Sequence, residues 1–191
     1  MFKKSSLAAL LLLWVAAPVE AREVNITSDS AVGWIPSEAD EHEARAFADG
    51  YLSAINHQQY DNAYMMLAPI NKALLSHDAF VHDKSSFAAK AGAVKARTIV
   101  RMTWTNNPAH APAPGIYAAI DVASRFTNID RDCGYIVVYR APGEHNFGVM
   151  REEANFIDNT TAAEIIRSRS TADLYQTWAM LTHNCPNQFA R

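Results

Sequence analysis

The spacing of apolar residues changes once along the chain, from a period near 3.6 residues to a period of two. Before Gly92, apolar residues recur every three or four positions, which predicts amphipathic helices. The clearest helix opens with a capping box at Ser37 and Asp40. Its apolar face consists of Ala44, Phe47, Ala48, Tyr51, Leu52 and Ile55. Two more helical stretches are predicted over residues 60–67 and 76–91.

Beyond Gly92 apolar and polar residues alternate, as they do in half-buried strands. Four strands are predicted, over residues 94–104, 116–126, 133–140 and 147–157. A proline-rich loop separates the first two, and the other connections are short, so an antiparallel meander is expected. Helices first and strands afterwards is the order of an α+β domain.

A final helical segment follows the strands and runs from a cap at Thr161–Glu164 toward Thr182. The chain is therefore expected to have four regions and no internal repeat. They are a signal peptide (1–21), a polar N-terminal arm (22–36), an α+β domain (37–158) and a C-terminal helical extension (159–191).

The first region has the pattern of a secretory signal peptide. Lys3 and Lys4 precede an unbroken apolar run, residues 7–17, and residues 19–21 place small side chains where cleavage requires them. A helix of that run would be about 16 Å long, roughly half the thickness of a bilayer core, so a retained anchor is the weaker alternative. The protein is expected to be periplasmic or secreted, with no transmembrane segment after cleavage.

Two cysteines, Cys133 and Cys185, remain in the chain after cleavage. An even number of cysteines in an oxidising compartment favours one disulfide between them. Two buried free thiols are the alternative.

Charge narrows the possible partners. The 191 residues include 17 Lys+Arg and 20 Asp+Glu, for a net charge of -3. Binding to nucleic acid through its backbone requires a basic face, so no nucleic-acid partner is expected. The length is sufficient for one domain with a full core.

Known chemical motifs are missing. His77 and His82 each precede an aspartate, but residues five apart point about 140° away from each other on a helix. The sequence has no metal-binding motif of paired His or Cys residues. It also lacks the Gly-x-Ser-x-Gly motif of serine nucleophiles and the clustered glycines of a phosphate loop. The sequence thus predicts no metal, no cofactor and no catalytic residue.

Three segments carry a resemblance to known families: 47–60 with its Gln59-Tyr60-Asp61 corner, 114–117 and 147–157. Over residues 44–157 the chain resembles the nuclear transport factor 2-like (cystatin-like) superfold, and within it an exported bacterial family of unknown function. The resemblance implies N-terminal helices packed on a curved four-stranded antiparallel sheet, forming a cone with a pocket. It implies no established catalytic residues.

Charged residues and one tyrosine on the predicted strands are the candidate ligand-binding side chains. Two interpretations remain open: a charged pocket for an anionic ligand, or a ladder of cross-strand ion pairs facing solvent. The candidates are Tyr117, Asp121 and Arg125 on the second strand, Arg97 and Arg101 on the polar side of the first, and Glu152 on the last.

The first functional hypothesis is a non-catalytic exported domain that binds a partner protein or a small ligand. The alternative is a small cone-pocket enzyme, an isomerase, hydratase or hydrolase, that uses a buried carboxylate. An enclosed pocket around a desolvated Asp or Glu would favour the enzyme, and a filled cone would argue against it. A third hypothesis is an inhibitor whose partner is a toxin or an enzyme. It requires an exposed apolar patch.

Overall fold

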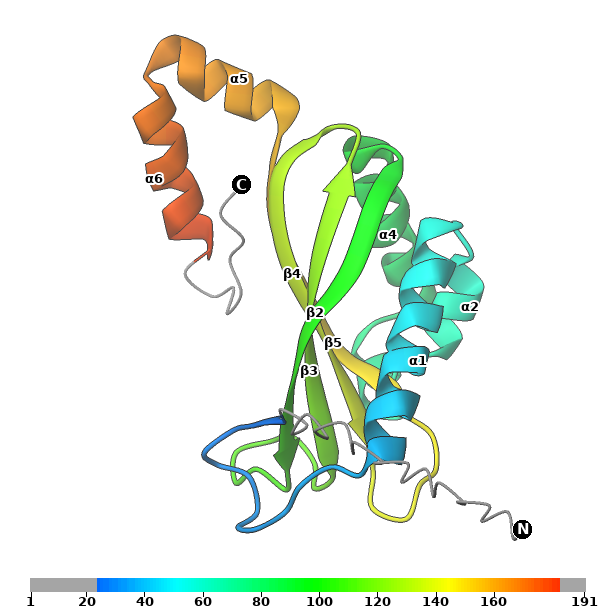
Figure 1. Cartoon of the computed structure of the whole chain (residues 1–191). Coiled ribbons are helices and arrows are strands. Elements are labelled where there is room, and N and C mark those ends of the chain that lie inside the picture. The colour runs from blue at the N-terminus through cyan, green and yellow to red at the C-terminus, as the bar shows by residue number, and fades with distance from the viewer. Residues whose placement is uncertain (1–23, 183–191) are drawn as a thin grey trace, which may run out of the picture.

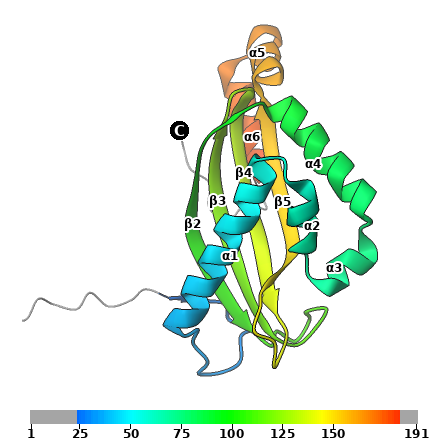
Figure 2. The same cartoon turned by 90° about the vertical axis from the view of Figure 1, so that its right-hand side faces the viewer.

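Four long antiparallel strands form one sheet and follow one another in chain order (Figures 1 and 2). The computed structural model describes residues 24–182. The strands are β2 (Val94–Asn106), β3 (Ile116–Phe126), β4 (Ile129–Arg140) and β5 (Gly148–Asp158). Each of them pairs with its sequence neighbours, which is the expected meander, and the α+β class is confirmed.

The sheet has a fifth strand, so the prediction of four strands was wrong in number. β1 (Asn25–Ile26) runs parallel to β2 and pairs with Thr103 and Trp104. The backbone N–H of Thr27 continues this pairing by donating to the carbonyl of Trp104 at 2.9 Å. A strand of two residues is too short to produce an alternating pattern, so the sequence showed only a polar arm there.

Six helices lie in the described part of the chain, where four helical stretches were predicted. They are α1 (Glu38–Asn56), α2 (Tyr60–Met65), α3 (Pro69–Leu74), α4 (His77–Ala91), α5 (Asn159–Ser168) and α6 (Thr171–Leu181). The additional α3 starts at Pro69, because a proline in the first turn lacks only an N–H that has no helical partner. The C-terminal stretch divides because Ser170 caps α6 by accepting from the N–H of Asp173.

Helices α1, α2 and α4 cover one face of the sheet, called here the inner face (Figure 2). The predicted capping box at Ser37 and Asp40 is present at the start of α1. Arg140 of β4 pairs with Asp40 and Glu43, which ties the beginning of α1 to the sheet. The largest buried side chains between the helices and the sheet are Tyr51, Phe80, Trp104, Ile120, Ile136 and Val149.

Helices α5 and α6 lie on the opposite side, the outer face, where they cover its upper part in Figure 1. A second apolar cluster holds them there: Cys133, Ile157, Ala162, Leu174 and Trp178. Cys185 lies outside the described residues, so the disulfide between Cys133 and Cys185 stays a prediction. No described helix covers the lower part of the outer face in this view.

An irregularity in β2 decides which side chains face the helices. The register between β2 and β3 shifts between Ile99 and Arg101, which is the effect of a β-bulge. Arg97 and Ile99 therefore point to the inner face, whereas Arg101 points to the outer face beside Asp121. The prediction that Arg97 and Arg101 share one face was wrong, because strict alternation does not hold across a bulge.

Within residues 24–182, no helix has both the length and the apolar composition needed to cross a membrane.

Candidate functional site

The structure divides the six candidate residues between the two faces of the sheet. Arg97 and Glu152 contact the helices of the inner face. Tyr117, Asp121, Arg101 and Arg125 follow the outer-face parity, with Arg125 exposed to solvent. No single charged pocket contains all six, so the candidates form two separate groups.

On the inner face, Glu152 is the centre of a partly buried polar cluster. The hydroxyl of Tyr51 donates to Glu152 Oε2 at 2.6 Å, and Lys84 Nζ lies 2.9 Å from the same oxygen. Burial raises the pKa of the Tyr51 phenol, and the charge of Glu152 raises it further. The carboxylate is thus compensated by a cation and a neutral hydroxyl donor.

Arg97 contributes the second cation of this cluster. Its Nε donates to Ser124 Oγ at 3.0 Å, and its Nη1 group contacts Asn56 and the carbonyl of Leu52. Burial lowers the pKa of the Arg97 guanidinium, while the carboxylates of Glu152 and Asp132 act in the opposite direction. These contacts hold the end of α1 against the sheet.

The inner cavity beside this cluster is small, at about 60 Å³. Phe87 of α4 lines this cavity, with ring centroids 5.5 Å from Phe126 and 5.2 Å from Phe156. Ligand pockets usually measure about 300–1,000 Å³, so this cavity has room for a few water molecules and no substrate. In this structure side chains fill the space between the helices and the sheet beside Glu152, where a cone pocket was expected.

On the outer face, Asp121 forms an ion pair with Arg101. The Arg101 Nε lies 3.3 Å from Asp121 Oδ2, and Asp121 is only 5% exposed. Burial raises the pKa of the Asp121 carboxyl, and Arg101 offsets this only in part. The two residues therefore form a cross-strand ion pair, as the second interpretation expected, but Asp121 is buried and does not face solvent.

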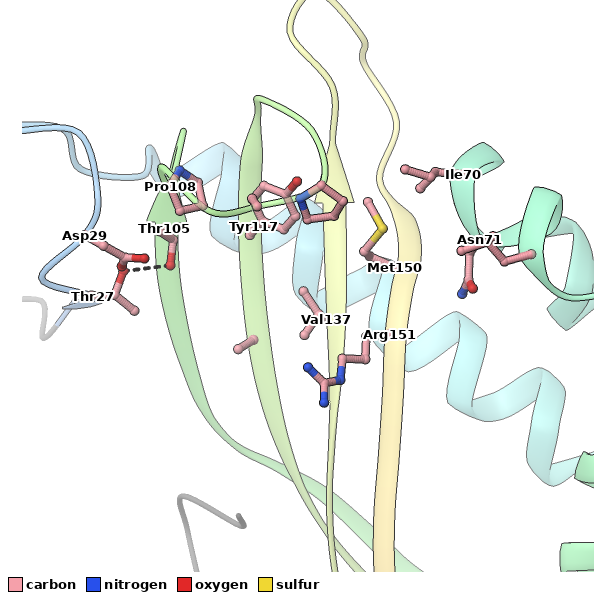
Figure 3. A pocket seen from close by; sticks show the side chains of 14 residues that line it. Thr27, Asp29, Ile70, Asn71, Thr105, Pro108, Tyr117, Val137, Met150 and Arg151 are labelled. Atoms are coloured by element: carbon pink, nitrogen blue, oxygen red, sulfur yellow. Dashed lines mark hydrogen bonds between the residues drawn. The ribbon is translucent and has the colours of Figure 1, made fainter.

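A larger hollow of about 490 Å³ lies on the uncovered part of the outer face and is called here the outer-face groove (Figure 3). Its floor crosses the sheet from β2 to β5. The apolar floor residues are Tyr117, Ala119, Val137 and Met150. The loop between β2 and β3 forms one wall with Pro108, Ala111 and Pro112.

Two tyrosines hold this wall over the floor. Tyr117 donates its hydroxyl to the carbonyl of Ala113, and Tyr139 donates to the carbonyl of Pro114 at 2.8 Å. The two rings lie 4.8 Å apart. Gly115 lets the loop turn at a φ of 143°, where an added Cβ would lie 2.5 Å from the carbonyl oxygen of Arg140.

Polar residues mark the two ends of the groove. At the β2 end lie Asp29 and the paired hydroxyls of Thr27 and Thr105, whose oxygens are 2.8 Å apart. At the β5 end lie Arg151 and Asn71, with Ile70 and Leu74 of α3 beside them. The groove thus has an apolar middle, an acidic end and a basic end.

The sequence identified only Tyr117 among the residues that line the groove. Ala119, Val137 and Met150 carry no chemical signal, because apolar residues on strands are usually core. Asp29 lies just after β1 and Asn71 lies in α3, both far in sequence from the long strands β2–β5. The three prolines of the loop were the one available signal of a rigid wall.

These features define a small α+β domain whose single sheet carries a helical layer on one face and an apolar groove on the other. Residues 47–147 match the family described as Protein of unknown function (DUF4019), and the chain belongs to this family. The matched segment contains β2, β3 and β4, whereas Asp29 and Arg151 lie outside it. No curated protein and no solved structure matches the chain.

Proposed function

We propose that this protein is an exported, non-catalytic domain that binds a small, largely apolar ligand in the outer-face groove. The observation that carries the proposal is the contrast between the two hollows. The groove offers about 490 Å³ over an apolar floor, whereas the inner cavity offers about 60 Å³. Of these two hollows, only the groove has the size and apolar lining that small-molecule sites usually have. A further hollow of about 660 Å³, lined by Lys72, Tyr139 and Glu144 among others, is more polar than the groove.

Export is supported by the composition of residues 1–21, with a basic start, an apolar run and small residues before the expected cleavage point. The placement would be periplasmic or secreted. The finer fold assignment, a cystatin-like cone of the nuclear transport factor 2-like type, is likewise part of the proposal. It is supported by three N-terminal helices packed on one face of an antiparallel meander.

The cone-enzyme alternative is weaker for two physical reasons. Glu152 Oε2 already accepts from the Tyr51 hydroxyl and pairs with Lys84. Both contacts stabilise the charged carboxylate, which weakens it as a general base. The cavity beside it would also need to widen several-fold before a substrate could enter.

A partner protein is the second candidate, because two large apolar side chains of α2 and α3 face solvent. Leu74 is 85% exposed and Met65 is 70% exposed. Exposed apolar patches often mark contact surfaces. Under this alternative, replacing Met65, which does not line the groove, with aspartate would abolish partner capture and leave small-molecule binding unchanged.

The proposal is tested by filling the groove. Ala119→Phe places a ring on the floor, so we expect it to weaken binding of the neutral apolar dye Nile red by about tenfold or more, measured by fluorescence titration. Ala123→Phe is the matched control, since it makes the same change on the same strand and face but outside the groove. Absence of dye binding to the unmodified protein, or equal binding by Ala119→Phe, would refute the proposed site.

A further inference from the structure

We infer that the ligand of the outer-face groove is an amphipathic acid whose carboxylate is bound by Arg151, with its apolar body across the floor. This inference rests on the proposed function and specifies the chemical class of its ligand. Four observations support it: the position of Arg151, its remaining hydrogen-bond donors, the arrangement of charge along the groove and the apolar floor.

The position of Arg151 follows from an irregularity in β5. Val137 pairs with Arg151 and Val138 pairs with Val149, so Met150 is an extra residue in β5. Because of this bulge, both Met150 and Arg151 line the groove, where strict alternation would allow only one of them. Figure 3 shows the guanidinium of Arg151 close to Val137, at the border of the apolar floor.

The guanidinium retains donors for a ligand. Arg151 presents five N–H groups in a planar fork. Glu153 Oε1 accepts from Nε at 2.7 Å and from Nη2, which occupies the side edge of that fork. The end of the fork, formed by Nη1 and the other N–H of Nη2, is the edge that binds a second carboxylate bidentately. The Arg151 side chain is 60% exposed, so solvent and ligands can reach it.

Charge along the groove gives the ligand a direction. Adjacent strands lie about 4.8 Å apart, and the guanidinium of Arg151 lies beside Val137 of β4, two to three strands from Asp29, so roughly 10–14 Å separate the two charges. This exceeds the Debye length of about 8–10 Å at physiological salt, so Asp29 and Arg151 act on separate ends of a ligand. Asp29 disfavours an anion at its end, while the hydroxyls of Thr27 and Thr105 suit a neutral polar group. The carboxylate is therefore assigned to the Arg151 end.

The test compares two probes of equal length, octanoate and 1-octanol, by calorimetric titration of the full chain. We expect octanoate to bind the unmodified protein more tightly, because only octanoate can pair with Arg151. Arg151→Gln is expected to weaken octanoate binding about fivefold and to change 1-octanol binding less than twofold, as befits a half-exposed ion pair. Arg125→Gln is the matched control, an exposed outer-face arginine outside the groove.

A double variant separates the role of Arg151 from that of its neighbour. Arg151→Gln leaves Glu153 uncompensated, and that negative charge could repel octanoate by itself. In Arg151→Gln with Glu153→Gln both charges are gone, so octanoate binding should stay weak if the guanidinium binds the carboxylate. Recovery to the unmodified affinity would refute the inference.

The remaining outcomes distinguish the inference from the proposed function. Equal binding of both probes, unaffected by Arg151→Gln, would overturn the anionic ligand and leave the apolar site intact. Failure of both probes to bind would overturn the proposed groove function and the inference with it. Thermal unfolding of each variant verifies that the fold is retained.

Discussion

At the scale of single residues, Asp121 shows that strand alternation can assign a carboxylate to the correct face of a sheet. It does not show whether that carboxylate is functional or structural. The sequence put Asp121 on one strand face with Tyr117 and Arg125, which is correct for the register. The strand alone could not indicate that Asp121 is almost completely buried beside Arg101, which directly follows the bulge in β2. Burial of a carboxylate depends on neighbouring strands, and these are set by tertiary structure.

The buried position of Asp121 predicts a particular pH dependence. Burial raises the pKa of Asp121 in the folded state above the unfolded value of about 3.9. A raised carboxyl pKa contributes stability that is complete below the unfolded pKa and is lost as the pH rises through the folded pKa. The unfolding free energy of the unmodified protein, measured in urea, should therefore fall relative to Asp121→Asn between about pH 4 and neutrality.

Asp40 is the control with the opposite sign. Burial acts to raise its pKa, but hydrogen bonds from Ser37 and Arg140 outweigh it and hold the pKa of Asp40 below the ordinary value. Its contribution is present above the unfolded pKa and is lost on acidification. Relative to Asp40→Asn, the unmodified protein should thus become less stable as the pH falls below about 4. The same slope for both variants would contradict the assignment of Asp121.

At the scale of elements, long periodic segments were predicted well and short irregular ones were not. The amphipathic face of α1 and its capping box were evident because each depends on local spacing. β1, α3 and the two strand bulges depend on contacts distant in sequence, such as the pairing of Asn25 with Thr103. The bulges matter most, since they turn Arg97 inward and bring Arg151 to the groove.

The loop wall of the groove predicts an asymmetry between two glycines. Gly115→Ala combines a φ of 143° with a Cβ 2.5 Å from the carbonyl oxygen of Arg140, so we expect a loss of about 2–4 kcal/mol in the free energy of unfolding. Gly143→Ala also has a positive φ, but nothing lies within 4 Å of the added atom, so a loss of about 1 kcal/mol is expected. Denaturant unfolding of both variants measures the difference. Equal losses would show that the close approach to Arg140 is relieved by movement of the loop.

At the scale of the whole molecule, two helical layers cover the sheet unequally. The N-terminal helices fill the inner face, and α5 and α6 cover only the upper outer face around Cys133 (Figure 1). The lower outer face is left open, and the groove lies there. The distribution of the helices over the two faces therefore decides where a ligand can bind.

The predicted disulfide would attach the C-terminal extension to β4. We expect a peptide that links Cys133 and Cys185 in mass spectrometry of the non-reduced protein. The bond would close a loop of about 50 residues, which corresponds to as much as about 4 kcal/mol in the chain-entropy model. Cys133→Ala, Cys185→Ala and the double variant should then lose the same stability, since each breaks the same bond. Additive losses would indicate two independent thiols.

The sequence by itself determined the features that depend on neighbours along the chain. These are the α+β order, the helix over residues 38–56, the four long strands and the leader pattern of residues 1–21. Tertiary structure alone decided that little space remains between the helices and the sheet at Glu152 and that the open groove lies on the opposite face. The physical reason is that periodicity states which side of a strand is apolar, whereas packing decides which apolar side is covered.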